Sequence, residues 1–247
     1  MHGRPKSHGC ISAIQFLTVI PLGNRAFNAR AALPYFPVCG LGIGCLVLFV
    51  DWAAARLWPP AVVALCDVLT LIVISGSLHL DGLADTGDGL YGHRSTNKIL
   101  AIMKDSRIGA MGMVAVLCCL AAKWIGISSL EMNRGLWLLL VPAYARGAVL
   151  IAIKLMPYGR PDGGTGHDFF APPLQAVDYW AFALLGAGSL AMGWDALKIN
   201  VGFVIIVSAT LAWYRRKLGT VTGDMLGALI EVTEAGLLVI AAAQWRG

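Results

Sequence analysis

The amino-acid sequence predicts an all-α, polytopic integral membrane protein that forms a single domain over residues 1–247. Three observations support this prediction: the composition, the lengths of the apolar segments and the placement of the charges. Hydrophobic residues make up 57% of the 247 residues and charged residues 13%, and the mean hydropathy is +0.71. Soluble globular proteins carry about 25% charged residues. An ordinary soluble enzyme, a disordered chain and a coiled coil are therefore excluded.

Seven apolar segments approach the roughly 20 residues that a helix needs to cross a bilayer. They cover residues 36–56, 61–80, 108–130, 136–156, 179–195, 198–213 and 226–243. The fifth and sixth segments are short and are expected to form a tight hairpin. Residues 9–22 are apolar but too short to span, so we interpret them as an interfacial or re-entrant helix that stops at Pro21. The expected architecture is about seven transmembrane helices plus this short N-terminal helix.

The basic residues predict the orientation in the bilayer. With the N-terminus inside, the inner loops receive Arg4, Lys6, Arg25, Arg30, Arg94, Lys98, Lys104, Arg107, Lys154, Arg160, Arg215, Arg216 and Lys217. The outer loops receive only Arg56, Arg134, Lys198 and Arg246. Cytoplasmic loops of membrane proteins carry an excess of Lys and Arg, so the N-terminus is expected in the cytoplasm. The net charge of +5 is explained by these loops and does not indicate a nucleic-acid partner.

The acidic residues concentrate in two short regions, residues 79–107 and 222–234. Asp81, Asp85 and Asp88 are spaced by four and then three residues, which places three carboxylates on one face of a helix. Three such carboxylates repel one another unless a cation neutralises them, and Mg²⁺ prefers carboxylate oxygens together with substrate phosphates. The alternative is a solvated polar loop. The spacing favours an Mg²⁺ site at the cytoplasmic end of a span.

Several side chains near this triplet are candidates for binding phosphate. Lys104 and Arg107 can share a helix face, with Asp105 between them orienting the two cations or the metal, although a surface ion pair is the alternative. Arg94 follows the triplet and can reach a pyrophosphate. His79 precedes the triplet by two residues and is a candidate for binding phosphate or relaying a proton, although a lone histidine is more often structural.

The second acidic region contains Asp224, Glu231 and Glu234, which extend along one face of the last apolar segment. Ionisable groups at membrane depth are costly and normally face a polar interior. We therefore expect Asp224 and Glu231 to face the same site as the triplet, and the alternative for the glutamates is a buried ion pair with Lys123 or Arg146. Thr222 indicates the N-terminus of a helix, where free amides can bind an anion.

Four sequence motifs resemble those of the cobalamin synthase family, the adenosylcobinamide-GDP ribazoletransferases. They are SLHLDGLADTGDG at residues 77–89, MKDSRIG at 103–109, TGDMLGA at 222–228, and FLT at 16–18 followed by Pro21. The resemblance covers essentially the whole chain in order and spacing. Two positions depart from it, because Ser77 and Thr220 stand where a glycine is expected.

The resemblance implies the last assembly step of the nucleotide loop of cobalamin, in the bacterial inner membrane and with Mg²⁺. The substrates would be adenosylcobinamide-GDP and α-ribazole or its 5′-phosphate, and the products adenosylcobalamin or its 5′-phosphate and GMP. In that reaction Asp81, Asp85 and Asp88 would hold Mg²⁺, while Lys104, Arg107 and Arg94 would hold phosphates. Asp88 and Asp224 are both candidates for the general base.

Two other functions stay open at this point. DTGDG at residues 85–89 resembles the start of the CDP-alcohol phosphotransferase motif, but the downstream glycine and two aspartates of that motif are missing. Intramembrane acids also occur in ion-coupled transporters, although here the acids cluster at one face and no inverted repeat is visible. A homo-oligomer is compatible with the sequence. The P-loop, zincin and serine-hydrolase motifs are absent.

Overall fold

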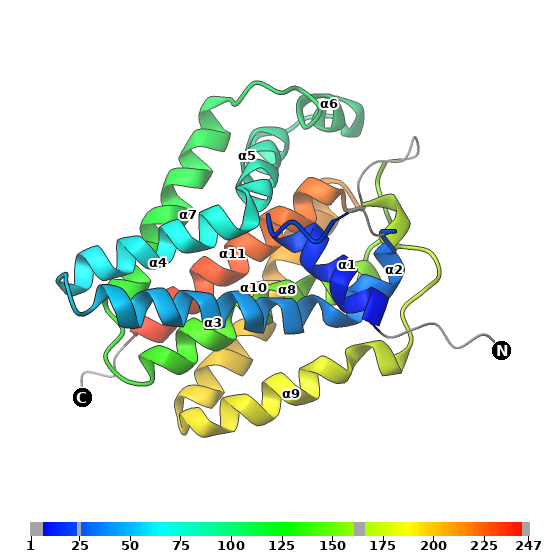
Figure 1. The fold of residues 1–247 in the computed structure, drawn as a ribbon. Coiled ribbons are helices and arrows are strands. Elements are labelled where there is room, and N and C mark those ends of the chain that lie inside the picture. Colours follow the sequence, from blue (N-terminus) through cyan, green and yellow to red (C-terminus); the bar gives the residue numbers. More distant parts are fainter. Residues whose placement is uncertain (1–6, 24–25, 161–165, 244–247) are drawn as a thin grey trace.

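The computed structural model describes residues 7–23, 26–160 and 166–243, and within these ranges the chain is helical (Figure 1). The α-helices are α1 (Ser7–Leu17), α2 (Ala29–Ala32), α3 (Phe36–Ala54), α4 (Pro60–Ser75), α5 (Leu78–Leu90), α6 (Thr96–Ile102), α7 (Ala110–Ser128), α8 (Arg134–Leu155), α9 (Trp180–Ser189), α10 (Asp195–Lys217) and α11 (Gly223–Ala242). Short 3₁₀ helices are η1 (Leu33–Tyr35), η2 (His167–Phe169), η3 (Ala176–Tyr179) and η4 (Leu190–Met192). The all-α prediction is confirmed.

Five of the described helical segments are long and apolar enough to cross a bilayer. They are Ala29–Ala54, α7, α8, α10 and α11, and α4 with α5 would make a sixth although these two helices are bent by 90°. The segment expected at 179–195 is a shorter apolar helix, Ala176–Met192, which combines η3, α9 and η4. Helix α1 is too short to cross, as the sequence predicted.

Polar contacts define one end of the helix bundle. Arg134 at the start of α8 donates to the carboxylates of Asp51 on α3 and Asp67 on α4, with Nη2–Oδ distances of 2.6 and 3.1 Å. Its neighbour Asn133 donates to the carbonyl of Met192 and the carboxylate of Asp195. The loops that join α3 to α4, α7 to α8 and α9 to α10 therefore meet at this end, which we call the Arg134 end.

The other end gathers the loops that carry the acidic motifs, and we call it the acidic end. Arg215 donates to the carbonyl of Leu155 at 3.0 Å, and Lys217 donates to the carbonyl of Gly92 at 2.9 Å. Asp178 at the start of the Ala176–Met192 segment pairs with Arg30 at this end. Because Met192 belongs to the Arg134 end, this short segment also runs from one end of the bundle to the other.

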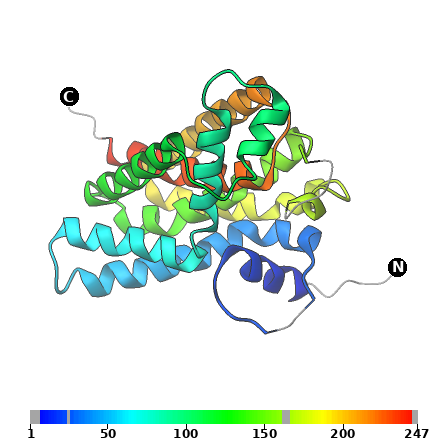
Figure 2. The ribbon, with the colours of Figure 1, turned by 90° about the horizontal axis from the view of Figure 1, so that it is seen from above.

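Helix α8 lies at the centre of the bundle, and its apolar window is 83% buried. Figure 2 shows α3 and α4 together on one side of the molecule and α10 on the opposite side. Large apolar side chains are exposed on the outer helices, among them Phe49, Val73, Leu117, Val204 and Ile205. A soluble protein rarely exposes so many large apolar groups, whereas lipid solvates them, so the outer surface is that of a membrane protein.

The sharp bend between α4 and α5 uses two successive residues in the left-handed region. Gly76 has φ +59° and Ser77 has φ +60°. Left-handed backbone is easy for glycine but costs about 1–2 kcal/mol for a residue with a Cβ atom. The glycine expected at position 77 is thus a conformational requirement of the bend, which Ser77 meets with strain.

We predict that Ser77→Gly raises the free energy of unfolding by about 1 kcal/mol, because it removes the Cβ atom from a left-handed residue. Ser77→Ala keeps the Cβ atom and is the matched control, with no gain expected. Thermal unfolding of the purified protein in detergent measures both variants. Equal melting temperatures for the glycine and alanine variants would contradict the strain argument.

Candidate active site

Helices α5 and α11 approach closely at the acidic end, where their two motifs meet. A Cβ atom placed on Gly82 would lie 2.6 Å from the backbone oxygen of Asp224, so only glycine permits this approach. One turn further along α11, a Cβ atom on Gly227 would lie 3.3 Å from the Cα atom of His79. The glycines of both motifs therefore bring Asp81 and Asp224, more than a hundred residues apart in sequence, to the same place.

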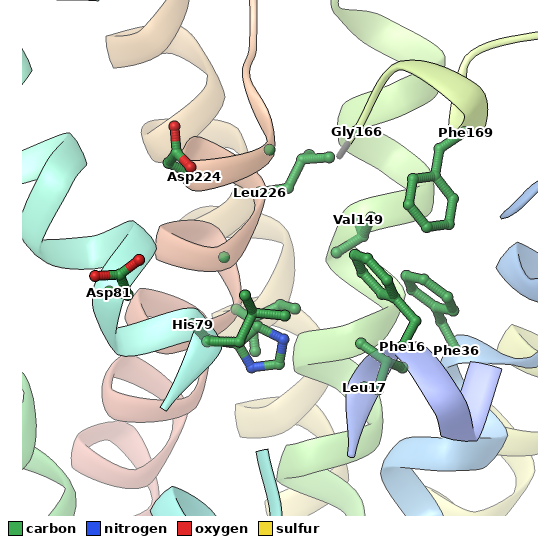
Figure 3. A pocket seen from close by; sticks show the side chains of 14 residues that line it. Phe16, Leu17, Phe36, His79, Asp81, Val149, Gly166, Phe169, Asp224 and Leu226 are labelled. Carbon is green, nitrogen blue, oxygen red and sulfur yellow. The ribbon is translucent and has the colours of Figure 1, made fainter. Parts of the chain in front are cut away.

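A cavity opens beside this contact, with about 100 Å³ of space for the centres of water-sized molecules. Asp81, His79 and Asp224 contribute to its wall, together with Phe16, Leu17, Phe36, Leu78, Val149, Gly166, Phe169, Gly223, Leu226, Gly227 and Ile230. Figure 3 shows the two aspartates on one side of the cavity and the phenylalanines on the other. The cavity combines an acidic end with an apolar interior.

Arg160 balances part of the negative charge. Its Nη2 atom lies 2.6 Å from the Oδ2 atom of Asp224 and also donates to the carbonyl of Met103 at 3.3 Å. Arg160 thus ties the segment after α8 to both acidic motifs. From the sequence, Arg160 was expected only to be one of the basic residues of the inner loops. The available signal was that Arg160 is the only Lys or Arg in the Gly- and Pro-rich residues 157–173.

The carboxylate of Asp88 caps the N-terminus of α7. Its Oδ2 atom accepts the N–H of Gly109 at 2.6 Å, and its Oδ1 atom accepts the N–H of Gly112 at 2.9 Å. A Cβ atom on either glycine would collide with this carboxylate. A negative charge at a helix N-terminus is favourable, so the structure gives Asp88 a positioning role that the three-carboxylate hypothesis did not include.

The basic residues of the phosphate hypothesis lie at the surface of the acidic end. Arg94 is exposed and donates to the backbone carbonyl of Asp88 at 2.6 Å. Arg107 forms an exposed ion pair with Asp105, and hydrogen bonds from Arg107 lower the pKa of Asp105 to about 2. Lys104 is exposed as well. The side chains of Arg94, Lys104, Asp105 and Arg107 do not line the cavity. Asp105 and Arg107 form the surface ion pair that was the alternative interpretation of the sequence.

Thr222 occupies the helix N-terminus that the sequence indicated. It is fully buried, and its Oγ1 atom accepts the N–H of Met225 at 3.3 Å, which is the N-cap bond of α11. The same hydroxyl lies 3.4 Å from the Oδ2 atom of Asp224 and can donate to it. Thr222 therefore fixes the start of α11 and the side chain of Asp224.

Glu231 lies deeper, in a buried cluster of two acids and two bases. Lys123 on α7 donates to Glu231 at 2.7 Å and also to Glu234, and Glu234 pairs in addition with Arg146 on α8. All four residues are at most 4% exposed. The structure thus shows the buried ion pair that the sequence left as the alternative, and Glu231 is not among the residues that line the cavity.

The comparisons with known proteins agree with one another. Residues 9–242 match the family described as cobalamin-5-phosphate synthase. This chain belongs to that family. It is similar to adenosylcobinamide-GDP ribazoletransferases of Herpetosiphon aurantiacus (34% identity, 94% of each chain) and Brevibacillus brevis (34% identity, 95% of this chain and 98% of the relative). The protein of the same name from Chlorobaculum tepidum is 32% identical over 97% of this chain and 96% of its own. No solved structure matches the chain.

In this member of the cobalamin-5-phosphate synthase family, the buried cluster locks α7, α8 and α11 together beneath the site. We predict that Glu234→Gln lowers the free energy of unfolding by about 3 kcal/mol, because Lys123 and Arg146 would both lose their shared partner in a dry environment. The matched control is Glu131→Gln, an exposed residue between α7 and α8, which should change little. Thermal unfolding in detergent measures both. Equal melting temperatures would show that the cluster does not stabilise the fold.

The donor set of this family member fits Mg²⁺ only with help from a substrate. Within residues 7–23, 26–160 and 166–243, no three His, Cys, Asp or Glu side chains gather closely enough to hold a metal ion. Mg²⁺ is commonly bound by one or two carboxylates together with substrate phosphates and water. Asp81, which lines the cavity, and Asp85, one turn further along α5, would supply such a pair, and both oxygens of Asp88 accept backbone N–H groups.

Proposed function

We propose that this protein is an adenosylcobinamide-GDP ribazoletransferase, which joins adenosylcobinamide-GDP to α-ribazole or its 5′-phosphate and releases GMP. The observation that carries the proposal is the convergence of Asp81 and Asp224 on one cavity, since they come from the two acidic motifs of the family. The full-length similarity to proteins of that name supports the substrate assignment. The reaction is a phosphoryl-group transfer, which depends on positioning and on charge stabilisation.

The proposed reaction exchanges the phosphoanhydride bond of the pyrophosphate for a phosphate ester bond to the acceptor. A ribose hydroxyl oxygen of α-ribazole forms a bond to the cobinamide-side phosphorus of the pyrophosphate, and the bond from that phosphorus to the bridging oxygen breaks. GMP leaves with the bridging oxygen, and the hydroxyl proton passes to a carboxylate. We assign this role to Asp224 because it lines the cavity, whereas the carboxylate of Asp88 is engaged by Gly109 and Gly112.

We further propose that Asp81 and Asp85 hold Mg²⁺ together with the pyrophosphate oxygens of the substrate. When bound, the ion would neutralise charge on those oxygens. Arg160 would support the same task, because its guanidinium lies at the acidic end and is held by Asp224 and the carbonyl of Met103. Arg94, Lys104 and Arg107 would attract the pyrophosphate from the surface, as exposed cations steer charged ligands.

We propose that the protein spans the inner membrane of the cell and that its acidic end faces the cytoplasm. Arg30, Arg160, Arg215 and Lys217 all make their contacts at this end, as the positive-inside rule requires of a cytoplasmic side. Labelling of single cysteines in a cysteine-free background tests the orientation. A cysteine at position 95 should be protected from an impermeant reagent in intact spheroplasts, and a cysteine at position 132 should be labelled. The reverse pattern would invert the assignment.

Release of GMP by the purified protein in detergent tests the proposed function. We expect GMP only when adenosylcobinamide-GDP, α-ribazole and Mg²⁺ are all present, with an equal amount of the cobalamin product by mass spectrometry. GMP release that does not require α-ribazole would indicate a hydrolase. Absence of GMP under all conditions would contradict the proposal, provided that the protein is monodisperse and shows a cooperative thermal unfolding transition.

A further inference from the structure

The wall of the cavity opposite the aspartates is aromatic and is built from three separate parts of the chain. Phe16 comes from α1, Phe36 from α3 and Phe169 from η2, and their rings pack in mutual contact. The ring centroids lie 4.8 Å apart for Phe16 and Phe169 and 5.7 Å apart for Phe36 and Phe169. Phe36 and Phe169 belong to the buried core, with Phe16 packed against it, and the same three rings give the acidic cavity an apolar aromatic wall that the phosphoryl-transfer chemistry does not use.

The floor of the same cavity contains an imidazole without a partner. His79 is 3% exposed, and among residues 7–23, 26–160 and 166–243 neither of its ring nitrogens has a hydrogen-bond partner. Figure 3 shows its ring beside the cavity, below the two aspartates and facing the side of Phe16 and Leu17. A buried polar group without a hydrogen bond costs about 1–3 kcal/mol, which a ligand in the cavity can recover.

We propose that this cavity is the subsite for the acceptor nucleoside, with the aromatic base of α-ribazole between the phenylalanines and His79. The proposal rests on the function proposed above and deepens it. The base is a planar, largely apolar bicycle that keeps one free ring nitrogen. Aromatic side chains stack on such bases, and a neutral imidazole supplies one donor for that nitrogen and one acceptor for a ribose hydroxyl.

Size and polarity distinguish the acceptor from the other substrate. Adenosylcobinamide-GDP carries a corrinoid that is far larger than a cavity of about 100 Å³. Its guanine is small enough, but it presents several hydrogen-bonding groups along its edge. A wall of Phe16, Phe36 and Phe169 would leave most of those groups unpaired, which disfavours binding. The apolar base satisfies the cavity with the single pair of groups on His79.

The position of the cavity also suits the reaction. A base held among the phenylalanines would direct its ribose toward Asp81 and Asp224, which Figure 3 places at the other side of the same cavity. The hydroxyl would then lie next to the proposed proton acceptor, while the corrinoid and its pyrophosphate approach from the acidic end. The cavity would thereby hold the smaller substrate in a fixed position while the larger substrate is joined to it.

Phe169→Ala tests the aromatic wall in the full-length protein. We expect the Kd for α-ribazole, measured by isothermal titration in detergent without the second substrate, to rise about 10-fold or more, because a stacking surface is lost. The KM for α-ribazole should rise in parallel, and the KM for adenosylcobinamide-GDP should stay within about two-fold. Phe182→Ala is the matched control, since Phe182 packs with Tyr179 and Phe203 outside the cavity.

His79→Gln tests the same subsite by a change that keeps a polar side chain and serves if Phe169→Ala does not fold. It should also weaken α-ribazole binding at least several-fold. Unchanged α-ribazole binding in a folded variant of either kind would overturn the subsite, and a selective rise in the KM for adenosylcobinamide-GDP would assign the cavity to guanine instead. Failure of the proposed function is a separate result, because it appears as absent GMP release in the unmodified protein.

Discussion

Asp85→Asn should reduce kcat for GMP release by at least about 1,000-fold and leave the melting temperature within a few degrees of the unmodified protein. Asn has the same shape as Asp but lacks its negative charge. It therefore binds Mg²⁺ poorly and does not neutralise the charge of the ion. Among the described residues, no protein group donates a hydrogen bond to the Asp85 side chain, so its removal leaves no buried donor unpaired. Loss of a positioned electrostatic group typically costs about 100- to 1,000-fold in kcat, and loss of a metal-binding carboxylate belongs at the upper limit.

Asp195→Asn is the matched control, because it removes an aspartate at the Arg134 end, far from the cavity. Its GMP release should equal that of the unmodified protein. Activity of Asp85→Asn within about ten-fold of normal at limiting Mg²⁺ would contradict the role of Asp85 as a ligand. Asp88→Asn should behave differently from both, because an amide cannot accept the N–H groups of Gly109 and Gly112 equally, and it should lower the melting temperature as well as the activity.

The parts of the structure that depend on periodicity were predictable from the sequence. Seven apolar segments were expected as spans, and among the described residues five helices are long and apolar enough to cross, or six if α4 and α5 count as one span. The carboxylates at positions 81 and 224 were expected to share a site because both acidic regions begin at the same end of the bundle. The structure places both at one cavity. The segment at residues 179–195 was expected as a short span, and the structure forms the shorter apolar helix Ala176–Met192 there.

The parts that depend on loop conformation were not predictable. Helical spacing places Asp88 on the face of Asp81 and Asp85, but the connection through α6 brings Gly109 and Gly112 to its carboxylate, and no periodic signal encodes that connection. Arg160 stands in an irregular segment rich in glycine and proline, where the sequence does not define a direction for the side chain. Glu231 was undecided because a buried acid and a substrate-binding acid have the same sequence pattern.

Arg160→Ala and Asp224→Ala should each reduce kcat for GMP release by at least about 100-fold, and the double variant should lose little more than the worse single variant. The two side chains form one ion pair at 2.6 Å, with 17% and 22% of their side-chain surfaces exposed. Removal of Asp224 takes away the proposed proton acceptor and frees Arg160 to move. Removal of Arg160 leaves Asp224 unbalanced beside Asp81 and breaks the contact to Met103. Residues that act as a unit give strongly non-additive effects, so the double-mutant cycle measures whether they form one functional element.

Arg160→Lys should restore part of the activity, since it keeps the charge but loses the second hydrogen bond. Arg30→Lys, at the ion pair with Asp178 elsewhere on the acidic end, is the matched control for Arg160→Lys and should keep near-normal activity. Independent effects that multiply in the double variant would separate the two roles, and the proton would then have to pass to a carboxylate that Arg160 does not hold.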